Sequence, residues 1–123
     1  MIHLDTNFLI AALKAGSRQE ASLNQWLSAN ENLAVSVVAW AEFRCGPLSK
    51  REQLISRQIF STIESLSVQD AETAADLFNQ TGRRSRSLAD CMIAAVAIRC
   101  GARLATINAP DFQPFAAFGL SLA

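Results

Sequence analysis

The chain has 123 residues, of which 50% are hydrophobic and only 18% are charged. We therefore expect one domain, spanning residues 1–123, that is large enough to bury a hydrophobic core. Eleven basic and eleven acidic residues cancel, so the net charge gives no sign of a nucleic-acid partner.

Hydropathy and cysteine content exclude several other classes. No apolar run approaches the roughly 18–20 residues that a membrane span needs, and acidic and amide side chains interrupt the start where a signal peptide would be apolar. We therefore expect a cytoplasmic protein with no membrane contact. The three cysteines form no C-x-x-C pair, which argues against both a disulfide framework and a zinc site, and we expect them to be reduced and buried.

The chain opens with a short apolar run that ends in an acid. Residues 1–4 predict a buried strand, and residues 8–13 predict the helix that follows it directly. Thr6 or Asn7 is expected to cap that helix. Asp5 lies at the turn, where open α/β sheets bind their ligands, although a helix-capping role would explain Asp5 equally well.

The remaining elements alternate between helices and short strands. The strands are expected at residues 33–37, 65–68, 103–107 and 118–122. The helices are expected at residues 17–27, 38–43, 49–63, 71–78 and 87–100, with a loop at 108–111. Short strands separated by helices predict an α/β fold, with a parallel sheet flanked by helices.

Three further acids stand near element junctions. Glu42 lies in an apolar helical stretch, where a lone carboxylate is costly unless it is paired. Asp90 is the third residue after Ser87, so it can belong to a capping box, and it precedes an almost wholly apolar helix. Asp111 follows the fourth strand. Each acid also has a plain structural explanation as a cap, surface or turn residue.

The shared placement of these acids suggests a metal site. The carboxyl ends of parallel strands meet at one edge of a sheet, so Asp5, Glu42, Asp90 and Asp111 are expected to converge there. Clustered carboxylates raise one another's pKa unless cations neutralise them. Oxygen-only ligands favour Mg²⁺ or Mn²⁺ over zinc, and such ions support phosphodiester hydrolysis by activating water and stabilising the leaving oxygen.

Four short motifs, in order, resemble those of PIN-domain proteins, and among them the VapC toxins of bacterial toxin–antitoxin pairs. The motifs are Leu4-Asp5-Thr6-Asn7, Ala41-Glu42-Phe43, Leu88-Ala89-Asp90-Cys91-Met92-Ile93-Ala94-Ala95, and Leu104-Ala105-Thr106-Ile107-Asn108 followed by Asp111-Phe112. The resemblance covers essentially the whole chain. It implies a three-layer α/β/α sandwich with a central, mostly parallel sheet of four or five strands.

The resemblance also implies an activity and partners. It implies an Mg²⁺- or Mn²⁺-dependent endoribonuclease that acts as a toxin, forms a homodimer and is held inactive by a cognate antitoxin. By match to the motifs, Asp5, Glu42 and Asp90 carry over as metal-site acids, with Thr6 as a supporting hydroxyl. The last acidic position of the family falls on Asn108 here, and Asp111 lies three residues further on. Asp111 has the negative charge that this position requires, whereas Asn108 stands at the expected place in the sequence. Both residues therefore remain candidates for the position.

Taken together, the expected catalytic residues are Asp5, Glu42, Asp90 and Asp111. Asp5 and Asp90 are the expected metal ligands, with Thr6 and Asn108 in support. Arg44, Arg84 and Arg86 are either solvated surface charges or contacts for RNA phosphates, and the sequence leaves both open. An alternative to the ribonuclease is a non-catalytic PIN-fold module that binds RNA or protein.

Overall fold

A computed structural model describes residues 1–82 and 88–123. Within these residues, five strands form one sheet in the order β3-β2-β1-β4-β5, and every neighbouring pair is parallel. The strands are β1 (Ile2–Leu4), β2 (Leu33–Ser36), β3 (Thr62–Glu64), β4 (Arg103–Ala105) and β5 (Ser121–Leu122). The prediction of an α/β fold built on a parallel sheet is confirmed.

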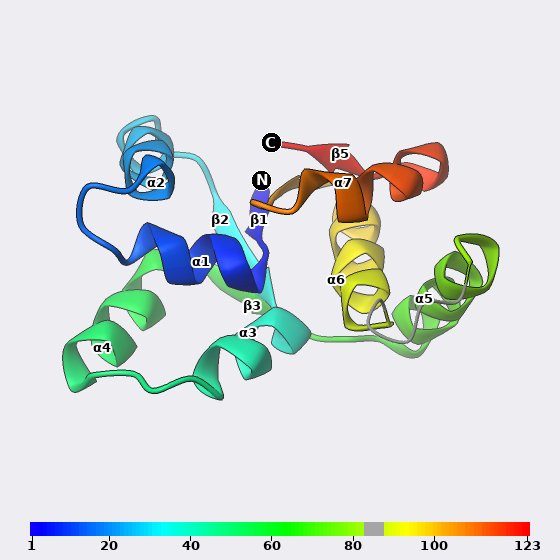
Figure 1. Cartoon of the computed structure of the whole chain (residues 1–123), viewed down its shortest axis with the longest axis horizontal. Helices are drawn as coiled ribbons and strands as arrows, with labels where there is room; N and C mark the ends of the chain where they lie inside the picture. The colour runs from blue at the N-terminus through cyan, green and yellow to red at the C-terminus, as the bar shows by residue number, and fades with distance from the viewer. Residues whose placement is uncertain (83–87) are drawn as a thin grey trace.

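Helices lie on both sides of this sheet and make the three layers that were expected (Figure 1). One side carries α1 (Thr6–Ala12), α2 (Arg18–Ser28) and α4 (Lys50–Ile59). The other side carries α5 (Val68–Gln80), α6 (Leu88–Arg99), α7 (Ala109–Phe112) and the 3₁₀ helix η1 (Gln113–Phe118). The remaining helix, α3 (Val37–Arg44), contributes Ala39 to one core and Phe43 to the other. In the described part of the chain, no helix is both long and apolar enough to span a membrane.

Two hydrophobic cores hold the sheet between its helices. Successive strand residues point to opposite faces, and Ile2 and Leu4 of β1 therefore enter the core under α1 and α2. His3, between them, is 1% exposed, and neither of its ring nitrogens has a hydrogen-bond partner within the described residues. Burial and the charge of Arg99 lower its pKa to about 4. His3 is thus neutral at pH 7.

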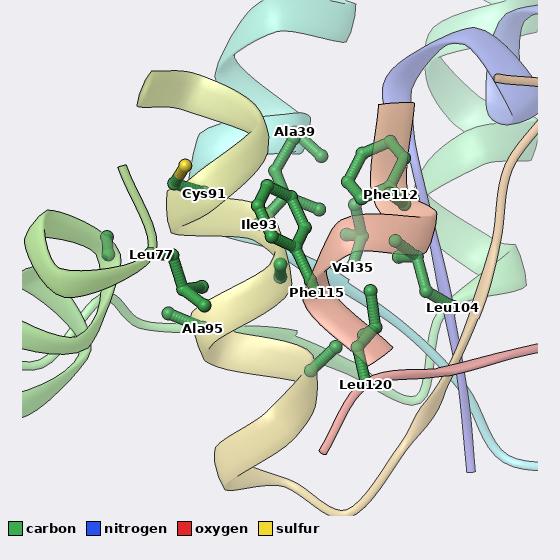
Figure 2. Close-up of a cluster of buried hydrophobic side chains, with 13 residues drawn as sticks. Val35, Ala39, Leu77, Cys91, Ile93, Ala95, Leu104, Phe112, Phe115 and Leu120 are labelled. Carbon is green, nitrogen blue, oxygen red and sulfur yellow. The ribbon is translucent and has the colours of Figure 1, made fainter. Parts of the chain in front are cut away.

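The second core surrounds α6 (Figure 2). Ile93 and neighbouring small side chains of α6 are fully buried, which allows α6 to lie close to both the sheet and α5. Phe112 and Phe115, from α7 and η1, pack into this core with their ring centroids 6.0 Å apart. Because Phe112 is anchored in this way, the neighbouring Asp111 is held at the surface beside β4.

Several helices and strands begin or end at other residues than the sequence predicted, and local hydrogen bonding explains part of the difference. The third strand lies at residues 62–64 instead of 65–68, because Ser67 and Asp70 form a reciprocal capping box that begins α5 at Val68. Residues 109–112, expected as loop, form the short helix α7 with Pro110 in its first turn. Of the cysteines expected to be buried, only Cys91 is so, since Cys45 is exposed and Cys100 is half-buried.

A charged pair links α5 to the end of α6. The sequence alone did not predict this pair. The Arg99 Nε donates to both oxygens of the buried Asp70 at 2.9 and 3.0 Å, and Arg99 Nη2 donates to the carbonyl of Ser65 at 3.1 Å. The guanidinium and the Ser67 donors lower the pKa of Asp70 against the opposing effect of burial. Asp70 therefore stays ionised while it is 1% exposed.

This pair predicts a large loss of stability on truncation. In Arg99→Ala, the Asp70 carboxylate would stay buried without its cation, and we expect the free energy of unfolding to fall by about 3 kcal/mol. Arg103→Ala is the matched control. Arg103 makes only a half-exposed pair with Glu31 at 3.6 Å, and its loss should cost less than about 1 kcal/mol. Urea unfolding of both variants measures the difference, and equal losses would contradict the assignment.

Candidate functional site

The site begins with Asp5, which follows β1 directly and is 3% exposed. Its Oδ1 accepts a hydrogen bond from the backbone N–H of Thr6 at 2.8 Å, and Asp5 is therefore the N-cap of α1. The prediction that Thr6 or Asn7 caps this helix was wrong. The capping role of Asp5 does not remove it from the site, because its second oxygen faces β4.

Thr106, just beyond β4, holds that second oxygen. Its hydroxyl donates to Asp5 Oδ2 at 3.0 Å and accepts the backbone N–H of Asn108 at 3.0 Å. Thr106 belongs to the last of the four sequence motifs, but the sequence alone indicates no role for it. The parallel register pairs Leu4 with Ala105, so the next residues along the two strands, Asp5 and Thr106, become neighbours. That register was the missing signal, because it joins residues 101 positions apart.

Glu42 reaches the site from α3. The Thr6 hydroxyl donates to Glu42 Oε1 at 2.8 Å, which makes Thr6 the link between two of the four acids. Glu42 is exposed, so the burial cost expected from its apolar sequence neighbours does not arise. Thr6, for which a supporting role is expected, thus contacts both Asp5 and Glu42.

Asp90 enters from the first turn of α6, where it is half-buried. Burial raises the pKa of Asp90 to about 6, and the charges of Asp5, Glu42 and Asp111 add to this effect. Burial also raises the pKa of Asp5, with Glu42 and Asp111 contributing, although the hydrogen bonds from Thr106 and Thr6 oppose the shift. The four acids are therefore electrostatically one group, assembled from four separate elements.

The two residues left open for the last position are placed differently. Asp111 is exposed on α7, and its charge nevertheless raises the pKa values of Asp5 and Asp90. Asn108 precedes α7 and makes no side-chain capping bond, while its backbone N–H binds Thr106. Asp111 thus adds negative charge near Asp5 and Asp90, and the backbone of Asn108 is linked to Asp5 through Thr106. Which of the two fills the last acidic position stays a prediction.

The chemistry of these donors suits a hard divalent cation. All are oxygen donors, and their mutual repulsion is the kind of strain that a cation relieves. Among residues 1–82 and 88–123, no group of three or more histidine, cysteine, aspartate or glutamate side chains is arranged to hold a metal ion. Mg²⁺, however, usually keeps several waters and takes only one or two protein carboxylates. A pair such as Asp5 and Asp90 fits that mode.

The arginines considered as phosphate contacts are only partly described. Arg84 and Arg86 lie outside the described residues. Arg44 is exposed in the last turn of α3 and, together with Trp40, lines a groove facing α4. It lies two residues from Glu42, on the opposite side of the helix.

The fold agrees with comparisons to known proteins. The model of the PIN-domain family matches residues 2–113. VapBC2 from Rickettsia felis, solved on a DNA fragment from its promoter, contains a similar chain with 23% identity and a TM-score of 0.76, covering 100% of this chain and 98% of that one. A toxin–antitoxin complex from Klebsiella pneumoniae gives 27% identity and a TM-score of 0.70, covering 91% of this chain and 90% of that one.

A third similar structure is VapC20 from Mycobacterium tuberculosis, described as a toxin that cleaves the sarcin–ricin loop. Its identity is 18% and its TM-score 0.69, covering 100% of this chain and 98% of that one. No curated protein matches the sequence.

The contacts of Thr106 give a prediction that does not depend on any activity. Thr106→Val removes one of the two hydrogen bonds that lower the pKa of Asp5, and we expect that pKa to rise above its wild-type value. Thr106→Ser keeps the hydroxyl and should restore the wild-type pKa. An NMR titration of the Asp5 carboxyl measures both, and an unchanged pKa in Thr106→Val would rule out the positioning role.

Proposed function

The chain belongs to the PIN-domain family, and on that premise we propose that it is an endoribonuclease, dependent on Mg²⁺ or Mn²⁺, that acts as the toxin of a toxin–antitoxin pair. The observation that carries the proposal is the electrostatic coupling of Asp5, Glu42, Asp90 and Asp111 at the carboxyl edge of the sheet. Among the described residues, no basic side chain forms an ion pair with these acids. Convergent acids of this kind are costly to the fold, so a function is the simplest reason to retain them.

Each acid has a distinct role in this proposal. Asp5 and Asp90 would hold the cation, because both carboxyl groups are at least partly buried and burial raises the pKa of each. Such a cation supplies Lewis-acid stabilisation of phosphoryl oxygens and activation of water. Glu42, fixed by Thr6, would orient the attacking water and accept its proton. Asp111, at the outer side of the group, adds negative charge that strengthens cation binding.

We extend the proposal to partners. Several similar structures are described as VapBC or toxin–antitoxin complexes, which supports an antitoxin partner for this chain as well. We propose in addition that the chain forms a homodimer.

Cleavage of RNA by the purified chain tests the proposal. Wild-type protein should cut total cellular RNA in Mg²⁺ or Mn²⁺, and EDTA should stop the reaction. Asp5→Asn should reduce the rate by at least about a hundredfold, since it removes a charge from the cation site. Asp76→Asn, an exposed acid on α5, is the matched control and should cut like the wild type. Equal cutting by Asp5→Asn, free of contaminating nuclease, would refute the proposal.

The alternative function, a non-catalytic module that binds RNA or protein, predicts a different pattern. Such a module would bind a partner without cutting RNA in either metal, and its binding would not depend on the four acids. Absence of cutting by protein freed of any co-purified antitoxin would therefore favour the module or a very narrow RNA substrate.

The raised pKa of Asp90 gives a stability prediction. An ionised Asp90 is disfavoured in the folded state, so its cost is fully present above about pH 6 and fades as the pH falls toward 4. Without metal, Asp90→Asn should therefore be more stable than the wild type at pH 8, by on the order of 2 kcal/mol, and should lose most of this advantage at pH 4.5. Thermal unfolding at the two pH values in EDTA measures the effect.

Addition of Mg²⁺ should instead stabilise the wild type relative to Asp90→Asn. The ion should raise the unfolding temperature of the wild type and leave that of Asp90→Asn nearly unchanged, because ligands stabilise only the states they bind. Lower stability of Asp90→Asn at pH 8 in EDTA would show that Asp90 is instead a structural residue.

A further inference from the structure

A basic groove of about 540 Å³ runs between α3 and α4. Its cationic residues are Arg44, Lys50 and Arg57, all exposed, and none of the described residues that line it is acidic. In the described part of the chain, none of the three side chains forms an ion pair or a side-chain hydrogen bond. Three unneutralised cations around one groove form a site for an anion or a polyanion.

The other groups in the groove are an aromatic ring, an amide and an apolar side chain. Trp40 is half-buried, with its ring against Phe43 and Phe60 at centroid distances of 5.7 and 5.9 Å. Gln53 lies on α4 between the cations, and Leu54 is 66% exposed. Cations combined with an aromatic surface are the combination that binds single-stranded nucleic acid, because the cations contact phosphates and the ring contacts bases.

The groove and the acid group share the last turn of α3. Glu42 and Arg44 are two residues apart, which places them about 200° apart around the helix. Glu42 accordingly faces Thr6 of α1, and Arg44 faces α4. The groove is therefore separated from the acids by roughly the 10 Å width of one helix, a distance that a few nucleotides of extended chain can cross.

We propose that this groove binds the single-stranded RNA that flanks the cleavage position, with Arg44, Lys50 and Arg57 on its phosphates and Trp40 against a base. The proposal rests on the ribonuclease function and adds to it a binding surface outside the acid group. An acidic protein segment would satisfy the same cations. RNA is the better fit because the groove adjoins, across α3, the acids proposed to cut it, and because its cations flank an aromatic ring.

The test measures binding apart from cutting. In the Asp90→Asn background and in EDTA, the fluorescence anisotropy of a labelled 12-nucleotide RNA of mixed sequence gives the Kd at several salt concentrations. Lys50→Gln with Arg57→Gln should raise the Kd about tenfold and lower the slope of log K against log salt by about 1.4, two phosphate contacts at about 0.7 each. Lys14→Gln with Arg18→Gln, exposed and outside the groove, removes the same charges and should change the Kd less than twofold.

The outcomes separate this proposal from the ribonuclease itself. Equal binding and equal slopes for the two double variants would overturn the groove as an RNA site, even if the wild type cuts RNA. Labelled polyglutamate, measured in the same way, represents an acidic protein segment. If Lys50→Gln with Arg57→Gln loses polyglutamate binding but retains RNA binding, the groove belongs to an acidic protein partner and the proposal is overturned. RNA binding lost only in the groove variant, in a chain that cuts no RNA, would support the groove and favour the binding module or a very narrow RNA substrate. Circular dichroism confirms that both variants are folded.

Discussion

The burial of the Asp5 carboxylate beside other acids is the constraint on which the rest of the site depends. A carboxylate that is 3% exposed must have hydrogen bonds to remain acceptable. Asp5 obtains one from the first amide of α1 and one from Thr106 beyond β4. These two bonds fix the carboxylate at the boundary between β1, α1 and β4, and the other acids are arranged around it.

The apolar parts of the chain hold the other acids in place. The core around α6 keeps the first turn of that helix, and with it Asp90, against the edge of the sheet. The buried ring of Phe112 does the same for Asp111. Repulsion within the acid group is therefore balanced by packing elsewhere, and this explains how a carboxyl with a pKa near 6 can persist in a stable fold. Such repulsion is the kind that a bound cation would relieve.

The sequence predicted the parts of this structure that depend on local chemistry. The strand that ends at Asp5 and the apolar helix after Asp90 follow from spacing and propensity, and both are present. The third strand was misplaced because Ser67 and Asp70 were not recognised as a capping box that competes with strand formation. Thr106 was missed because its role requires the register between β1 and β4, which no local pattern encodes.

We expect this group of acids to bind a divalent cation. Counting the Mn²⁺ ions that bind to the chain tests that expectation most directly. Electron paramagnetic resonance of free Mn²⁺, titrated with the purified chain, gives the number of ions bound. At least one ion should bind to each wild-type chain, and binding should be lost when Asp5 and Asp90 are both replaced by asparagine. Equal binding by the wild type and the double variant, or no binding by a wild type that still cuts RNA, would contradict the account.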